Sequence, residues 1–198
     1  MTTASPYAES LARIPVVEHN AVVGGASTAW WEYGPAHAEH TVIAVHGYRG
    51  DHHGLEPVVA QLPGTRIVTP DLPAFGRSGP FGAAHTVEAY ADWLVAFCAL
   101  IAEQSPDGTD ITVLGHSFGS IVVSAALERG LAPNRVILIN PIAAPALAGP
   151  KGILSQTQAP QFGEAQLPGA ISVSDTFLKA GGHVPTMIPN VTGTSKKR

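Results

Sequence analysis

Short apolar runs alternate with segments of helical periodicity along the first 140 residues of the chain. Such alternation predicts βαβ units, and hence an α/β protein with a mostly parallel sheet flanked by helices. The first two expected strands are joined at Gly24-Gly25, a dipeptide typical of hairpin turns. The expected strands are Val16–Val23, Ser27–Tyr33, Thr41–Val45, Arg66–Thr69, Ile111–Leu114 and Val136–Ile139.

Helices are expected in three of the intervals between these strands. An apolar stripe predicts one over Leu55–Leu62, and Thr86 is placed to cap a longer one with its hydroxyl. Apolar side chains of the longer helix recur at i, i+3, i+4 and i+7, the pattern of a helix that faces a core. Another helix follows Ile111–Leu114 and ends at Gly130.

Composition narrows the class of protein. A chain of 198 residues with 45% hydrophobic content suits one packed domain. The net charge of −4 argues against nucleic acid as a partner, and the single cysteine, Cys98, excludes a disulfide framework. Neither a secretory signal nor an 18-residue apolar run is visible. We therefore expect a cytoplasmic protein that does not contact a membrane.

The pattern changes near residue 154. Every lysine lies at or beyond Lys151, and the only aromatic residues after residue 150 are Phe162 and Phe177. We interpret residues 1–154 as an α/β core with about six strands. Residues 155–198 form an atypical segment in which 170–174 alone resembles a short strand.

The motif that carries chemistry is Gly115-His116-Ser117-Phe118-Gly119, which fits G-x-S-x-G between an expected strand and an expected helix. A sharp turn there holds Ser117 in a strained conformation, and side chains at 115 or 119 would collide with neighbouring backbone. The Phe118 amide then lies at a helix N-terminus, where it favours an oxyanion. The amide of Tyr48, which follows His46-Gly47, is a second candidate donor.

These segments, together with Asp71-Leu72-Pro73-Ala74-Phe75-Gly76-Arg77-Ser78-Gly79, give residues 15–150 a clear resemblance to the α/β-hydrolase fold family. The resemblance implies a cofactor-independent hydrolase with Ser117 as nucleophile and the Tyr48 and Phe118 amides as oxyanion hole. It places His46, Gly47 and His116 at the substrate pocket, with His46 packing the loop. It also implies that Asp71 orders the loop after its strand.

The base and the acid of a triad are harder to place. The family order is serine, acid, histidine, and His183 is the only histidine after Ser117. Glu128 lies about 16 Å along its helix from Ser117, so Asp175 is left as the formal acid. Asp175 and His183 are eight residues apart, too few for the helix and strand that normally separate acid from base.

Two accounts follow from this spacing. In the first, a compact serine hydrolase folds Asp175 and His183 over Ser117 and cleaves a small apolar ester through an acyl-enzyme. In the second, which the composition break favours, the chain is a truncated or frame-altered homologue without the usual lid and C-terminal strands. Such a homologue is inactive or only binds ligands, and its exposed sheet edge permits a homodimer.

No metal site is expected. Asp51, His52 and His53 are adjacent in the sequence, and neighbouring side chains point in different directions. We therefore interpret these residues as a solvated loop.

Overall fold

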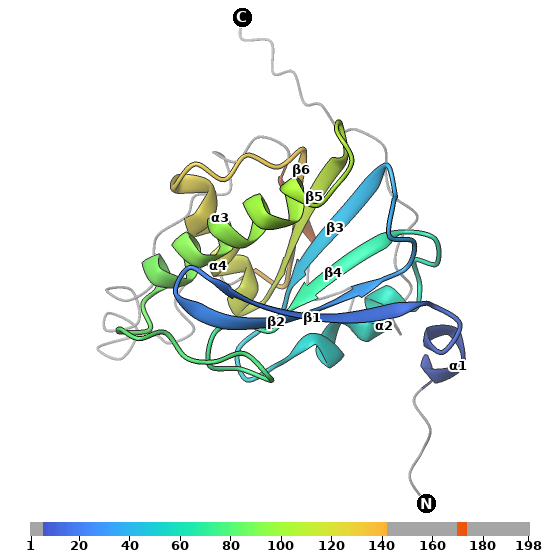
Figure 1. Cartoon of the computed structure of the whole chain (residues 1–198), viewed down its shortest axis with the longest axis horizontal. Helices are drawn as coiled ribbons and strands as arrows, with labels where there is room; N and C mark the ends of the chain where they lie inside the picture. Colours follow the sequence, from blue (N-terminus) through green and yellow to red (C-terminus); the bar gives the residue numbers. More distant parts are fainter. Residues whose placement is uncertain (1–5, 142–169, 174–198) are drawn as a thin grey trace, which may run out of the picture.

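Seven strands form one sheet in the part of the chain that this computed structural model describes, residues 6–141 and 170–173. Figure 1 shows the sheet at the centre of the molecule. The strands are hydrogen-bonded in the order β1-β2-β4-β3-β5-β6-β7. β1 and β2 form an antiparallel hairpin, and β2 pairs antiparallel with β4. All further pairs, from β4 through β3, β5 and β6 to β7, are parallel.

The strands confirm the predicted α/β class and all six strands expected in the core. Their ends differ from the expected ones by at most two residues. The strands are β1 (Val16–Val23), β2 (Ala26–Tyr33), β3 (His40–Val45), β4 (Arg66–Pro70), β5 (Asp110–His116), β6 (Arg135–Ile139) and β7 (Ala170–Val173).

The long helix and the helix after β5 also occur where they were expected. The Thr86 hydroxyl accepts a hydrogen bond from the Ala89 amide at 3.2 Å, which confirms the predicted cap. The described helical elements are α1 (Ala8–Leu11), the 3₁₀ helix η1 (His52–Leu55), α2 (Glu56–Val59), α3 (Val87–Glu103) and α4 (Phe118–Glu128).

The helix expected over Leu55–Leu62 is wrong in its extent. The segment is a 3₁₀ turn, η1, followed by the single turn of α2 that ends at Val59. Pro57 has no N–H group to continue the hydrogen-bond ladder from η1, and Pro63 disfavours helical backbone at the residue before it. Leu55 and Val59 are nevertheless buried, as their spacing predicted.

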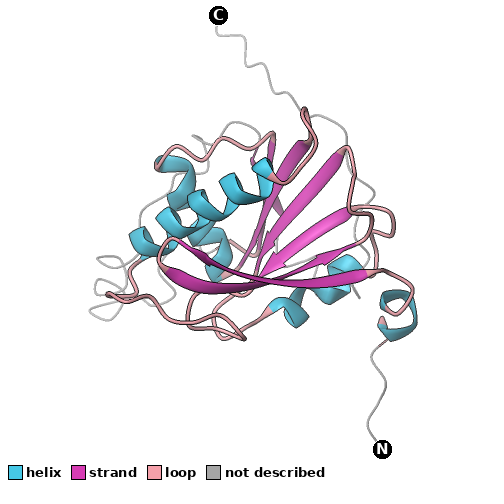
Figure 2. Ribbon diagram, in the orientation of Figure 1, coloured by secondary structure: helices cyan, strands magenta, loops and turns pink. Residues whose placement is uncertain are grey.

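The helices lie in two layers (Figure 2). α3 and α4 cover one face of the sheet, whereas η1 and α2 cover the other. On the first face the fully buried Trp93 and Phe97 stack with 5.5 Å between ring centroids, and Trp30 meets Phe97 edge-on. Cys98 belongs to this core, and burial raises the pKa of its thiol to about 12. The sheet therefore has a separate apolar core on each face.

β7 shows that the sheet extends beyond residue 154. The short strand anticipated at 170–174 is present at Ala170–Val173, and it pairs in parallel with β6. β1 forms the opposite edge, where Val16, Val17 and Val22 are exposed. The homodimer through a sheet edge stays a prediction.

No helix among the described residues is both long and apolar enough to cross a membrane.

Candidate active site

The loops after β3 and β5 meet where these two neighbouring strands end. Both strands are parallel, so their carboxyl ends lie side by side, with Val45 paired to Gly115. A Cβ atom built on Gly47 would lie 3.1 Å from the Cβ of Ser117. The segment that carries Tyr48 is thus packed directly against the turn that carries Ser117.

Ser117 has the strained backbone that the motif predicted. Its φ of 53° and ψ of −116° lie outside the conformations that residues other than glycine usually adopt. Its N–H donates to the carbonyl of Ile139 on β6 at 2.9 Å, which ties the turn to the neighbouring strand. The half-buried serine is the single residue between the end of β5 and the start of α4.

Glycine is required on both sides of this turn. A Cβ atom at Gly115 would lie 2.6 Å from the carbonyl oxygen of Gly119. A Cβ atom at Gly119 would collide with the carbonyl oxygens of Val45 and His46, the latter at 2.6 Å. Real Cβ atoms essentially never approach so closely, so α4 can start against β3 only with glycine here. The predicted steric role of both glycines is confirmed.

Two backbone N–H groups near Ser117, those of Tyr48 and Phe118, are free to donate a hydrogen bond in the described part of the chain. The Phe118 amide is in the first turn of α4, where N–H groups lack partners within the helix. Within residues 6–141 and 170–173, neither this N–H nor that of Tyr48 donates to an acceptor. A free donor at a helix N-terminus, as the Phe118 N–H is, favours a developing negative charge.

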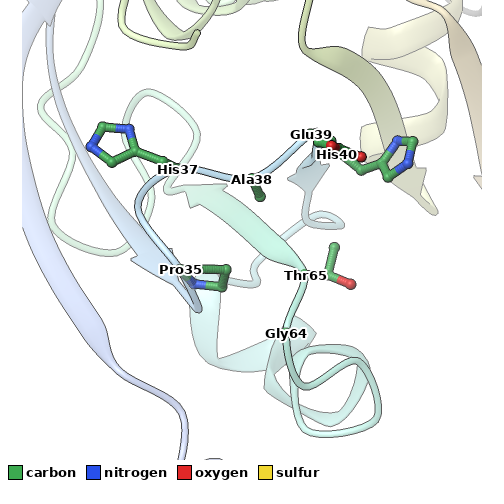
Figure 3. A pocket seen from close by; sticks show the side chains of 7 residues that line it. All are labelled: Pro35, His37, Ala38, Glu39, His40, Gly64 and Thr65. Atoms are coloured by element: carbon green, nitrogen blue, oxygen red, sulfur yellow. The ribbon is translucent and has the colours of Figure 1, made fainter.

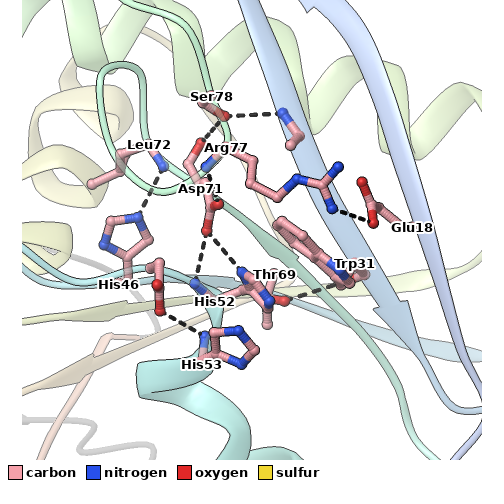
Figure 4. A network of polar contacts seen from close by, with 12 residues as sticks. Glu18, Trp31, His46, His52, His53, Thr69, Asp71, Leu72, Arg77 and Ser78 are labelled. Atoms are coloured by element: carbon pink, nitrogen blue, oxygen red, sulfur yellow. Dashed lines mark hydrogen bonds and ion pairs between the residues drawn. The ribbon is translucent and has the colours of Figure 1, made fainter.

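Asp71 orders the loop after β4, as the sequence predicted. Its fully buried carboxylate accepts hydrogen bonds from the amides of His52 and Arg77, each at 2.8 Å (Figure 4). The Ser78 hydroxyl donates to the Asp71 carbonyl at 2.7 Å and accepts from the Ala29 amide. One carboxylate thus joins the loops after β3 and β4.

His46 connects the same two loops through the hydrogen bonds of its buried side chain. Its Nε2 accepts from the Leu72 amide at 2.9 Å, so Nδ1 carries the proton and donates to the Gly47 carbonyl at 2.7 Å. The side chain is 1% exposed, and this burial lowers its pKa. Both ring nitrogens are occupied by main-chain groups, so the role that the structure shows for His46 is to hold the two loops together.

His116 lies against Gly47. A Cβ atom on Gly47 would be 3.3 Å from its Nδ1, and partial burial lowers the pKa of the ring.

His52 corrects the interpretation of residues 51–53 as a solvated loop. Its side chain is buried and stacks on Trp31, with ring centroids 3.3 Å apart, while Nδ1 lies 3.1 Å from the Asp71 carboxylate. His52 is buried while His53 stays exposed, although the two rings remain in contact. No signal in the local sequence marked this difference, because Trp31 and Asp71 are distant along the chain.

An aromatic cluster flanks the Ser117 turn. Tyr48, whose side chain is exposed, meets Phe75 and Phe118 edge-on, with ring centroids 5.8 and 6.2 Å away. Phe118 in turn meets Tyr90 of α3, whose hydroxyl donates to the Pro73 carbonyl. The sequence analysis does not assign Phe75 and Tyr90 to the site. Phe75 lies in the segment from Asp71 to Gly79, and Tyr90 is a buried residue of α3.

Asp175 and His183 lie outside the described residues. Within the described ranges, no histidine or carboxylate side chain is hydrogen-bonded to the Ser117 hydroxyl. A surface pocket of about 270 Å³ is lined by Pro35, His37, Glu39 and Thr65, among others (Figure 3). It lies where β3 and β4 begin, at the end of the parallel strands opposite to Ser117.

The fold and the turn together define the class of protein. Residues 42–192 match the sequence model of the alpha/beta hydrolase family, and the chain therefore belongs to that family. The match extends beyond residue 154, where the motifs ended.

Three known proteins are similar to parts of this chain in sequence or in structure. The chain is 36% identical over 111 residues to a protein named "Probable oxidoreductase EphD" from Mycobacterium tuberculosis; this covers 53% of the chain and 18% of the relative. A putative lipase from Acinetobacter baumannii has a TM-score of 0.57 at 19% identity, covering 75% of this chain and 50% of the lipase. The epoxide hydrolase CorEH has a TM-score of 0.54 at 18% identity, with coverages of 69% and 47%. The chain thus aligns with half or less of each of these proteins.

Proposed function

We propose that the protein is a serine hydrolase that cleaves a small apolar ester through an acyl-enzyme. The observation that carries the proposal is Ser117 at φ 53°, held between β5 and α4 beside the loop of Tyr48. Membership of the alpha/beta hydrolase family supports hydrolysis as the reaction class. A serine at this turn supports acyl transfer, because a hydroxyl activated by a base attacks carbonyl carbon.

The reaction proceeds in two halves. Ser117 Oγ attacks the ester carbonyl carbon and its proton passes to His183, while the carbonyl oxygen becomes an oxyanion. The intermediate then expels the alcohol, which takes the proton from His183 and leaves an acyl group on Ser117. Water, deprotonated by His183, attacks this acyl group; the bond to Ser117 Oγ then breaks, the acid is released, and His183 returns the proton to Oγ. Asp175 orients His183 and stabilises its charged form.

The amides of Tyr48 and Phe118 supply the oxyanion hole in this proposal. Both are free of acceptors in the described part of the chain, and the positive end of the α4 dipole reinforces the Phe118 amide. Preorganised donors of this kind contribute about 3 kcal/mol each to transition-state stabilisation. The aromatic rings of Tyr48, Phe75 and Phe118 give the mouth of the site an apolar character that suits an apolar acyl group.

A fluorophosphonate probe tests the nucleophile. Wild-type protein should be labelled on Ser117, and the Ser117→Ala variant should not react, because only an activated serine attacks phosphorus. Ser10→Ala, which removes an exposed serine of α1, is the matched control and should label like wild type. Labelling is measured by intact-mass spectrometry, and hydrolysis is followed with p-nitrophenyl acetate and butyrate.

The His183→Ala variant separates hydrolysis from binding alone. Loss of at least about 10³-fold in kcat is expected if His183 is the base. A wild-type protein that neither labels nor turns over esters, yet is stabilised by an ester analogue equally well with and without His183, would be a binding protein and would refute the proposed function.

A further inference from the structure

A side-chain cluster on the opposite face of the sheet from α3 and α4 has the composition of a metal site. His52, His53 and Glu56 each offer one ligand atom, and these atoms all lie within 4.8 Å of one another. All three belong to η1 and the first turn of α2. The two imidazole rings lie close together (Figure 4). Their centroids are 3.9 Å apart.

The donor set selects the kind of cation. Two imidazole nitrogens and one carboxylate oxygen suit Zn²⁺ and neighbouring divalent transition ions, whereas Mg²⁺ and Ca²⁺ prefer oxygen ligands. Three protein ligands leave at least one position for water.

One ring nitrogen of His52 already has a carboxylate partner. Its Nδ1 lies 3.1 Å from the Asp71 carboxylate, and its ring is stacked on Trp31. Nε2 is therefore the nitrogen that remains for coordination. A carboxylate on the far nitrogen of a ligating histidine is the usual arrangement around protein-bound zinc, because it fixes the ring and raises the basicity of the ligand.

His53 and Glu56 need only small adjustments. Their Nδ1 and Oε1 atoms are 2.7 Å apart, and two ligands on one tetrahedral zinc ion are separated by about 3.3 Å. The His53 side chain is 64% exposed, so a cation can reach the space between the two groups from solvent. Glu56 is also contacted by the Tyr33 hydroxyl at 3.4 Å, which limits the motion of its carboxylate.

We propose that His52, His53 and Glu56 form a binding site for a divalent transition-metal ion of the Zn²⁺ type. Through Asp71, such an ion would link η1 and α2 to the loop after β4, since that carboxylate also binds the Arg77 amide. The expected consequence is a more stable protein. The proposal does not depend on Ser117 or on hydrolysis.

The experiment is a zinc titration of the full chain, with no histidine tag, after treatment with EDTA. Isothermal titration calorimetry should show one saturable site, and thermal melting should show a higher Tm with Zn²⁺ than without. Co²⁺ should give visible absorption of the intensity typical of four-coordinate nitrogen and oxygen ligands.

Two variants and one control decide the location. His53→Gln and Glu56→Gln should each weaken Zn²⁺ binding about tenfold or more, because each removes a ligand. His40→Gln is the matched control: His40 is 66% exposed and is likewise paired with a carboxylate, Asp110, at 3.5 Å. The control should bind like wild type.

Saturable binding that only His53→Gln and Glu56→Gln weaken supports the site. Absence of saturable binding, an unchanged affinity in His53→Gln, or an equal loss in His40→Gln would overturn it. His53 has an exposed side chain and makes its side-chain contact with Glu56 alone among the described polar partners, so this variant is expected to fold normally.

Discussion

At the scale of single residues, the turn at Ser117 depends on close contacts with the end of β3, which is distant in the sequence. Its φ of 53° costs about 1–2 kcal/mol for a residue with a side chain, and the surrounding fold must supply that energy. Gly119 contributes by letting the start of α4 lie against the carbonyls of Val45 and His46. The geometry of the candidate nucleophile therefore rests on a glycine two residues away.

Gly119→Ala is expected to destabilise the fold by about 3 kcal/mol, because the new methyl group overlaps backbone atoms of β3 that cannot move aside. Gly82→Ala is the control, since a Cβ atom there would meet nothing within 4 Å. Urea unfolding measures both variants. A Gly119→Ala protein as stable as Gly82→Ala would show that the turn is looser than the contacts indicate.

At the scale of elements, the loops after β3 and β4 behave as one unit. His46 and Asp71 each connect the two loops through main-chain groups, and both side chains are buried. The sequence predicted the loop-ordering role of Asp71 from its motif. It could not predict that His52 would be a partner, because that contact depends on where Trp31 and β4 lie in the sheet.

The buried His46 makes this unit sensitive to pH. Burial lowers its pKa below that of the unfolded chain, about 6.5, so the unfolded state takes up a proton before the folded state does. The contribution of the neutral His46 to the free energy of unfolding is complete above pH 6.5. It is lost as the pH falls below this value, by at most about 1.4 kcal/mol for each pH unit.

Urea unfolding at pH 7.5 and pH 5.5 measures this loss. His46→Gln, whose amide oxygen can still accept from the Leu72 amide, should reduce the difference between the two pH values. Some difference should remain, because the pKa of the half-buried His116 is also lowered. An unchanged difference in the variant would show that His46 is not the group responsible.

At the scale of the whole molecule, hydrophobic periodicity was enough to predict the α/β class and the order of the core elements. The antiparallel contact of β2 with β4 was not predictable in this way, since it depends on packing between strands far apart in the sequence. The same applies to the site: the motifs located Ser117, Tyr48 and Phe118, whereas the contribution of Tyr90 required the position of α3 over the sheet. Local sequence patterns are enough to predict where a helix or strand lies. Which elements and side chains it contacts depends on packing between segments that are distant in the sequence.

The buried position of Cys98 gives the chain an internal reporter of its own dynamics. It is the only cysteine of the sequence, and its thiol, with a pKa of about 12, is buried in the core that α3 and α4 form with the sheet. Reagents such as dithionitrobenzoate can reach it only when α3 separates from the strands or the domain unfolds. The rate of thiol modification therefore measures opening of this layer in the unmodified protein, without any introduced label.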